Sequence, residues 1–538
     1  MPCLYPKGII CGVSCRLPPA GCLLTPAGTG IAHPLYHTGV HAAMSAYNGK
    51  ALANPLLISL LGAATGVGLF LILTLPFKYA SVVLAAIALT VLALVARQWK
   101  WFFLGCLILG VPVQLKKTVY PYSLDHIGGP GGVDILLADC ALFALYIHWV
   151  LTSVTRRHER LVRFSTTDAL VMLSITVSGL SLLGAGDLTL GVVDFIRMIK
   201  VGLIYFYLAN NIKDVKELKF IVLGLMVGLV INDAISMAQY LLGRPLGLAF
   251  LGELKEFNVS IYSDESRPSG VMPSANTSAL YVVSVLPYVF TSLFWLKSRL
   301  LKAFSLSTFA SGLFTLVITL SRGTWVAFLC TVPVMLFLLI KKHFIAYRRH
   351  FHIFVLISLL CLAIVGFLYP KIMDRLLNTP NIPIYTRVFL NNLSFDLFSS
   401  HPFAGVGLNN FAETARDVIR TIPDPHNIFD LVVDNPVAHN LYLFIAVETG
   451  VVGLMSFMLI VFALAMNARQ LLRLSDPFLS TFGIATLSFF VSFAVAEMFD
   501  FSYRLDQVFY LFWTLAGLIV ASGRIGERLG GAQETGSA

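Results

Sequence analysis

Residues 322–340 read RGTWVAFLCTVPVMLFLLI, and this stretch decides the fold class. Its only charged residue is Arg322 at the first position, and Lys341 and Lys342 follow directly after it. A helix needs roughly 20 mainly apolar residues to cross the hydrocarbon core, because unpaired backbone groups are costly in lipid. The stretch therefore predicts a membrane-spanning helix with basic residues at one end.

The same rule applied outward from this segment predicts an all-α polytopic membrane protein with about fourteen (12 to 14) transmembrane helices. Hydrophobic residues make up 57% of the 538 and charged residues only 12%, which excludes an ordinary soluble protein. The third span is the shortest. The predicted spans are 55–75, 79–96, 101–115, 133–154, 167–184, 192–210, 218–240, 276–296, 304–320, 322–340, 352–369, 438–465, 477–496 and 504–521.

Lys and Arg cluster in alternate connections between these spans, and Lys116 and Lys117 are the exception. The positive-inside rule then predicts a multi-pass protein of the inner (cytoplasmic) membrane with both termini cytoplasmic. It places the long connections 241–275 and 370–437 outside. The net charge of +10 follows from this topology, and no basic stripe predicts nucleic acid as a partner.

The chain is expected to divide into four parts. Residues 1–54 form a disordered cytoplasmic tail, and Met44 is a second plausible start ahead of the first strong apolar run. Residues 55–185 hold the N-terminal transmembrane helices, 186–500 a second membrane domain that includes the external loop 370–437, and 501–538 the last transmembrane helix and a cytoplasmic tail. No pair of the eight cysteines has CxxC spacing, so neither zinc nor redox chemistry is predicted.

Three basic side chains lie where the predicted topology reaches the outer leaflet: Arg197, Arg322 and His439. An arginine at the bilayer centre costs about 2.5–3.5 kcal/mol on insertion scales, so such residues are functional candidates by default. Each also has a structural interpretation. Arg322 can extend to the interface, Arg197 can pair with Asp194 on its own helix, and His439 can cap a helix.

Four motifs resemble the O-antigen ligase and O-antigen polymerase superfamily. They are SRGTW from 321, HPFAGVGLNNF from 401, HNLY from 439 and ETGVVGL from 448. The segment RPSG from 267, running on to Asn276, and Arg387 also fit the family pattern. The resemblance covers roughly residues 190 to 500, and it implies a GT-C-like membrane enzyme whose long external loop carries short amphipathic helices.

The resemblance implies an inverting glycosyl transfer that needs no metal and no cofactor. The donor would be an undecaprenyl-diphosphate-linked glycan, and the acceptor would be a lipid or glycan hydroxyl. Membrane lipids would surround the protein. Arg197 and Arg322 are the candidates for holding the diphosphate, since a guanidinium matches phosphate oxygens. His439 is the candidate general base. Predicted substrate-binding residues are Arg387, Arg267, Gly405, Gly407 and Asn440, although two glycines after a proline are more often only a turn.

Two alternatives stay open. A lipid-linked oligosaccharide flippase or another polysaccharide transporter also fits this number of spans, although transporters usually place ionisable residues near the midplane. Within the transferases, the acceptor can be lipid A core, another repeat unit of O-antigen, capsule or exopolysaccharide, or a protein hydroxyl. The sequence leaves the acceptor and the sugar undecided.

Overall fold

The computed structural model describes residues 98–123, 126–155, 162–254, 267–349, 363, 366–377, 382–422 and 436–536. All of them belong to the second of two compact units, Leu92–Ala538. The predicted tail 1–54 and the predicted spans 55–75 and 79–96 lie outside the described residues, as does most of the span 352–369.

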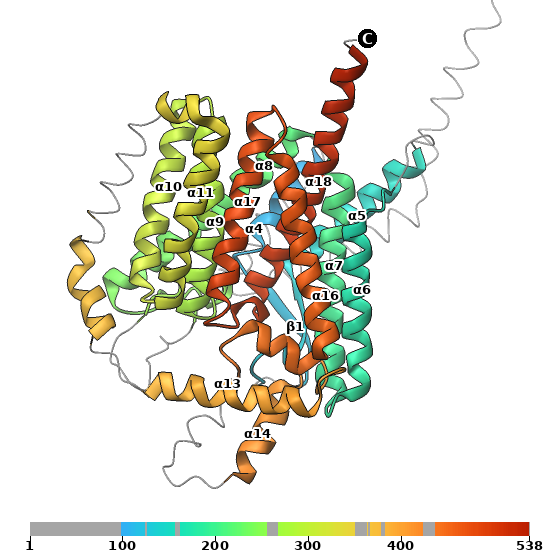
Figure 1. The fold of residues 1–538 in the computed structure, drawn as a ribbon, viewed down its shortest axis with the longest axis vertical. Helices are drawn as coiled ribbons and strands as arrows, with labels where there is room; N and C mark the ends of the chain where they lie inside the picture. The colour runs from blue at the N-terminus through green and yellow to red at the C-terminus, as the bar shows by residue number, and fades with distance from the viewer. Residues whose placement is uncertain are drawn as a thin grey trace, which may run out of the picture. The chain divides into compact units, whose positions relative to one another are not determined.

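The described part is an integral membrane protein built mainly from helices (Figure 1). Eight helices are long and apolar enough to cross a membrane. Helix α7 is also long, but it carries Asp194, Arg197 and Lys200. The helices are α4 (Trp99–Leu109), α5 (Leu137–Thr155), α6 (Thr166–Ser181), α7 (Leu188–Asn211), α8 (Val215–Leu242), α9 (Ala275–Trp295), α10 (Arg299–Ile318), α11 (Arg322–Arg349), α13 (Ile382–Ser400), α14 (Phe411–Thr421), α16 (Leu441–Leu471), α17 (Pro477–Ala496) and α18 (Asp506–Gly536).

Two predicted spans differ from the structure. The apolar stretch 101–115 gives only the 11-residue helix α4, which is too short to cross a bilayer. The segment 133–154 begins as strand β2 (Gly132–Leu136), and α5 starts only at Leu137. Strand β2 pairs antiparallel with β1 (Lys116–Pro121), so Lys116 and Lys117 lie on a hairpin and not in a loop after a span. The hairpin explains why these two lysines broke the charge pattern.

Short polar side chains set where the helices begin. Ser165 and Asp168 form a reciprocal capping box at the start of α6. The carboxylate of Asp187 accepts hydrogen bonds from two N–H groups at the start of α7. The carboxylate of Asp476 accepts one hydrogen bond from an N–H group at the start of α17. Each cap satisfies backbone donors that have no partner within the helix. The apolar stretches therefore begin as helices at defined residues.

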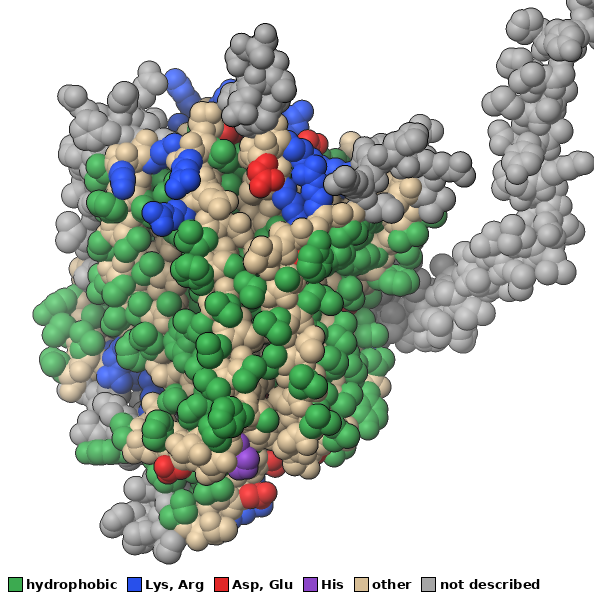
Figure 2. Space-filling model, turned by 45° about the vertical axis from the view of Figure 1, so that its right-hand side comes forward, with side chains coloured by type: hydrophobic (Ala, Val, Ile, Leu, Met, Phe, Trp, Pro, Cys, Tyr) green, Lys and Arg blue, Asp and Glu red, His purple; other side chains and the backbone are tan. Residues whose placement is uncertain are grey.

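Helices α9 and α18 form the centre of the bundle, where almost all of their apolar length is covered by other helices. Helix α17 packs against both α9 and α11, while α6 and α11 leave much of their surface uncovered. Apolar side chains are exposed there, as Leu173 on α6 and Leu329 on α11 illustrate. Figure 2 shows this as a broad hydrophobic band, with Lys and Arg gathered at the end where the C-terminus lies. This separation matches the predicted charge clusters, and the assignment of that end to the cytoplasm stays a prediction.

The opposite end of the bundle is closed by helices that do not run with the spans. Helix α13 crosses beneath the bundle, and α14 lies below it (Figure 1). Both contact α16. They belong to the long connection that the sequence predicted at 370–437. The starts of α16 and α18 and the end of α17 lie at this same end, and they supply most of the candidate site.

Candidate functional site

His439 and Asp500 form a pair at the end of the bundle near α13. His439 Nδ1 lies 3.4 Å from Asp500 Oδ1, and both side chains are partly buried. A backbone hydrogen bond from Leu441 N to Glu497 O, 2.9 Å long, joins the start of α16 to the end of α17. Two segments 61 residues apart are therefore fixed side by side, with the histidine facing a carboxylate.

Asp500 is held by its own neighbours in the connection between α17 and α18. Its Oδ1 accepts a hydrogen bond from Phe501 N at 2.9 Å, and its Oδ2 accepts one from Ser502 Oγ at 2.9 Å. Burial raises the pKa of the Asp500 carboxyl, but the His439 hydrogen bond and charge, the Phe501 N–H and the Arg387 charge outweigh it and keep the pKa below its usual value. Asp500 is therefore a carboxylate able to orient the His439 ring.

Arg387 acts on the Asp500 carboxylate through its charge, and Arg322 acts in turn on Arg387. Arg387 lies on α13, and its pKa is lowered first by burial and further by the charge of Arg322, against the charge of Asp500. Gly323 packs against Phe499, which places the start of α11 beside Asp500. Neither guanidinium has a carboxylate within ion-pair distance among the residues the structure describes. Two like charges that repel each other, with Asp500 acting on Arg387 only from beyond ion-pair distance, favour an anionic ligand.

Arg267 shapes the turn from which α11 starts. Its Nε donates to Thr319 O at 2.8 Å, and its Nη2 donates to Asn276 Oδ1 at 2.7 Å. In that turn Leu320 adopts a left-handed conformation with φ of 51°, which is uncommon for a residue with a side chain. Arg267 therefore lies beside the break before Arg322, and its described contacts are to the protein.

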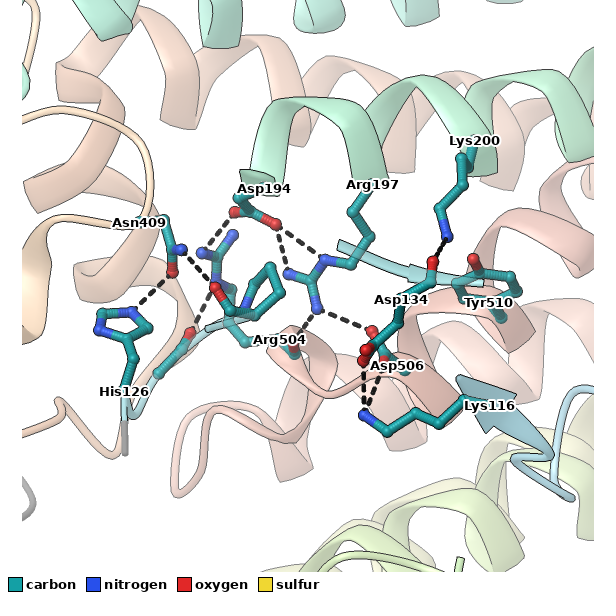
Figure 3. Close-up of polar contacts among 12 residues, drawn as sticks. Lys116, His126, Asp134, Asp194, Arg197, Lys200, Asn409, Arg504, Asp506 and Tyr510 are labelled. Atoms are coloured by element: carbon teal, nitrogen blue, oxygen red, sulfur yellow. Dashed lines mark hydrogen bonds and ion pairs between the residues drawn. The ribbon is translucent and has the colours of Figure 1, made fainter. Parts of the chain in front are cut away.

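Arg197 lies at the same end of the bundle, in a different set of contacts (Figure 3). Its Nη2 lies 2.7 Å from Asp194 Oδ1, and its Nη1 lies 3.1 Å from Asp506 Oδ1 and 2.6 Å from the carbonyl oxygen of Arg504. Arg504 Nη2 in turn lies 2.7 Å from Asp194 Oδ2 and 3.1 Å from Glu448 Oε2. These residues form a buried ion network that joins α7, α16 and the start of α18.

The network changes the role we assign to Arg197. Its side chain is 6% exposed and surrounded by the carboxylates of Asp194 and Asp506, so its charge is already neutralised. A donor diphosphate would have to displace these carboxylates. The structural interpretation, in which Arg197 pairs with Asp194, fits this geometry better than the predicted diphosphate contact.

A family comparison covers the region that holds the His439 pair. Residues 306–458 match the family model for O-antigen ligase. The match confirms the resemblance to the O-antigen ligase and polymerase superfamily. It includes Arg322, Arg387 and His439, and it excludes Arg197 and Asp500. No curated protein matches the chain.

Within the matched region, Asn440 has a structural role, and its predicted substrate contact stays a prediction. Its side-chain oxygen accepts hydrogen bonds from Tyr442 N at 3.0 Å and Leu443 N at 3.2 Å, so it caps α16. The cap fixes the direction in which α16 leaves His439. Asn440 therefore supports the candidate base from the adjacent position.

Gly405 and Gly407 likewise pack against the protein. Helix α16 is broken at Gly450, whose φ is 68°, and the broken backbone pairs with residues 402–407, the loop that holds both glycines. Val406 N donates to Val447 O at 2.8 Å, and Gly407 N donates to Glu448 O at 3.1 Å. A Cβ on Gly405 would lie 2.4 Å from the Glu448 backbone. The glycines therefore allow a loop to lie directly on a helix, and the predicted approach to sugar or phosphate does not explain them.

Asp500, Arg504 and Asp506 are site residues that the sequence analysis missed. All three lie in FDFSYRLD, residues 499–506, directly after the apolar stretch 477–496. The predicted topology placed this stretch at the outer face, where Arg197, Arg322 and His439 were singled out. Applying the same criterion to acidic residues at the ends of spans would have found Asp500.

Proposed function

We propose that this protein is a membrane glycosyltransferase that moves a glycan from a polyprenyl-diphosphate carrier, undecaprenyl diphosphate in bacteria, to a hydroxyl acceptor at the outer membrane face. The observation that carries the proposal is the grouping of His439 and Asp500 with Arg322 and Arg387, two arginines without a carboxylate at ion-pair distance in the described part of the chain. The O-antigen ligase match over 306–458 supports the same class of reaction.

Donor binding follows from the position of the two arginines. The polyprenyl tail stays in lipid and the diphosphate lies at the interface, at the end of the bundle where α11 begins. Arg322 and Arg387 would contact phosphate oxygens and stabilise the charge that develops on the leaving diphosphate. Arg267 would support Arg322 through the turn at Thr319 and Leu320 and need not touch the donor.

Acceptor activation would use the His439–Asp500 pair. With the Nδ1–H of His439 directed to Asp500, the Nε2 atom is the one available to take the proton of the acceptor hydroxyl. The hydroxyl oxygen then attacks the anomeric carbon while the bond from that carbon to the phosphate oxygen breaks. One displacement inverts the anomeric configuration and releases polyprenyl diphosphate. The step needs no metal ion, so EDTA should leave transfer unchanged.

The test compares His439→Ala with wild type in a strain that lacks the chromosomal copy, at matched membrane abundance. We expect lipid-linked donor to accumulate and product to fall about 100- to 10,000-fold, the usual contribution of a general base. His401→Ala is the matched control, because His401 lies in the turn after α13 and has no acidic partner among the described residues.

Normal transfer with His439→Ala would contradict the catalytic assignment and favour the transporter alternative. The trapped donor distinguishes the acceptors. Full-length glycan on the carrier indicates a ligase, whereas single repeat units indicate a polymerase.

A further inference from the structure

A cavity of about 230 Å³ lies beside the Arg197 network and apart from the His439 pair. Its walls come from the β1–β2 hairpin, the segment that leads into it, α7 and the start of α18. The residues that decide its chemistry are Gln114, Lys116, Asp134, Arg197, Asp506 and Gln507. Figure 3 shows the charged members of this group facing one another.

The charges around the cavity are balanced within the protein. Lys116 Nζ lies 2.7 Å from Asp134 Oδ2 and 3.8 Å from Asp506 Oδ2, and Arg197 is held by Asp194 and Asp506. Burial lowers the pKa of Lys116, but these carboxylates outweigh it and raise the pKa above its usual value. An anionic ligand would gain little here, since each cation already has a carboxylate partner.

Two neutral amides on the cavity wall carry polar atoms without a partner. Gln114 Nε2 and Gln507 Oε1 have no hydrogen-bond partner among the described residues, and the two residues are 8% and 2% exposed. A buried polar atom left unpaired is costly, so such atoms are normally paired with protein groups, ordered water or a bound ligand. One atom is a donor and the other an acceptor.

We propose that this cavity binds one uncharged sugar ring of the glycan that the enzyme handles. The inference rests on the proposed function, and it adds a second substrate contact away from His439. A sugar hydroxyl both donates and accepts hydrogen bonds, so it can satisfy both amides. The volume is below the roughly 300–1,000 Å³ of sites for drug-sized ligands, which suits a single ring. Balanced charge disfavours the diphosphate, and the polar wall disfavours the lipid tail.

The cavity and the His439 pair are joined by one short connection. Asp500 and Ser502 lie on the histidine side, and Asp506 and Gln507 lie on the cavity side. Ser502 Oγ also lies 3.3 Å from Thr277 Oγ1, four residues after Pro273, which lines the cavity. A glycan chain that reaches His439 can thus place a neighbouring ring in the cavity. The ring belongs either to the donor glycan or to the acceptor glycan.

The experiment measures transfer by purified full-length protein while donor and acceptor concentrations are varied separately. We expect Gln507→Leu and Gln114→Leu each to raise one KM about tenfold with kcat nearly unchanged, the usual effect of losing one hydrogen bond. A higher KM for the donor assigns the ring to the donor glycan, and a higher KM for the acceptor assigns it to the acceptor. Gln470→Leu, at the exposed end of α16, is the matched control.

Thermal unfolding separates binding from a structural role. Replacing an unpaired buried amide by Leu should hold or raise the Tm of the ligand-free protein, whereas a structural amide would lower it. Unchanged KM values for both substrates in both variants would overturn the proposal.

A binding measurement keeps this result independent of catalysis. Ligand-detected NMR with methyl glycosides of glucose, galactose, mannose and rhamnose should show binding to wild type and to His439→Ala, and loss of binding in Gln507→Leu. Binding without transfer by wild type would uphold the cavity and reject the transferase. Absence of binding by all four glycosides, together with unchanged KM values, would reject the cavity while leaving the transferase intact.

Discussion

Two groups of basic side chains lie at the same end of the helix bundle, and they differ in how their charges are balanced. Arg197 and Arg504 share the buried carboxylates of Asp194, Asp506 and Glu448. Arg322 and Arg387 have no carboxylate within ion-pair distance among the described residues, and their charges repel. The comparison teaches that an arginine at a membrane interface is a binding residue only when its charge is still available to a ligand.

The difference between the two groups is tested most directly by a substitution at Arg197. Arg197→Ala leaves Asp194 buried with one partner fewer, and removing one member of a buried ion pair costs about 3–5 kcal/mol. We expect a lower Tm and lower membrane abundance, with near-normal transfer per folded molecule. Arg420→Ala is the control, because Arg420 is 63% exposed and its pair with Asp417 is long at 3.9 Å. A stable but inactive Arg197→Ala protein would contradict this structural role and support a contact between Arg197 and the substrate.

The opposite outcome is expected at Arg322. Arg322→Ala should lower transfer by about 100- to 1,000-fold, the cost of losing one group that stabilises developing charge. Its Tm should stay near that of wild type, because the guanidinium has no carboxylate partner among the described residues to lose. The measurement is glycan transfer at matched abundance, with Arg299→Ala at the start of α10 as the control. Full activity in Arg322→Ala would remove the diphosphate contact from the mechanism.

A smaller effect should follow from Gly450→Ala in the break of α16. The added Cβ would lie 2.0 Å from Phe403 O, and φ of 68° is itself strained for alanine by about 1–2 kcal/mol. We expect Tm and transfer to fall together, because both charge groups are connected to α16. Gly243→Ala has a similar φ of 64° but a ψ of 17°, against −174° at Gly450, and it meets no atom within 4 Å, so it gives the cost of a positive φ without a close contact. Equal Tm losses in the two variants would refute the contact.

The smallest expected effect concerns pH and Asp500. Its folded pKa lies below the ordinary value of 3.8, so the carboxylate contributes stability that is present above about pH 4 and lost as pH falls through the folded value. Asp500→Asn lacks this contribution. The Tm difference between wild type and Asp500→Asn should therefore be constant above about pH 4 and shrink below it. A difference that grows on acidification would contradict the assignment.

The long spans were predictable because their signal is local. Residues 322–340 and 477–496 are apolar over the length that a bilayer requires, and both are helices in the structure. The stretch 101–115 has the same composition, but it ends in a short helix and a hairpin. Composition alone does not record that residues 116–121 pair with 132–136, a contact between segments that a local pattern does not contain.

The sequence predicted at which end of the molecule the candidate site lies, but only some of the contacts between its residues. The topology placed Arg197, Arg322 and His439 at one end without using contacts. Asp194 was visible as a neighbour of Arg197 three residues away on the same helix. Asp506, which completes the neutralisation of Arg197, lies 309 residues further along the chain, and no local pattern links the two.

The loop before α14 is attached to α16 at the helix break. Val406, Gly407 and Val451 hold this loop to the helix through main-chain atoms, in hydrogen bonds of 2.8–3.1 Å. These three bonds use main-chain atoms only, so the exposed positions 403 and 404 can vary while the attachment persists, whereas Asn409 and Asn410 hold the loop to Leu190 and Asp187 through their side chains. A variant that replaces the exposed Phe403 and Ala404, and keeps Gly405, Gly407 and Gly450, should acquire a new outer surface while the attachment to α16 is unchanged.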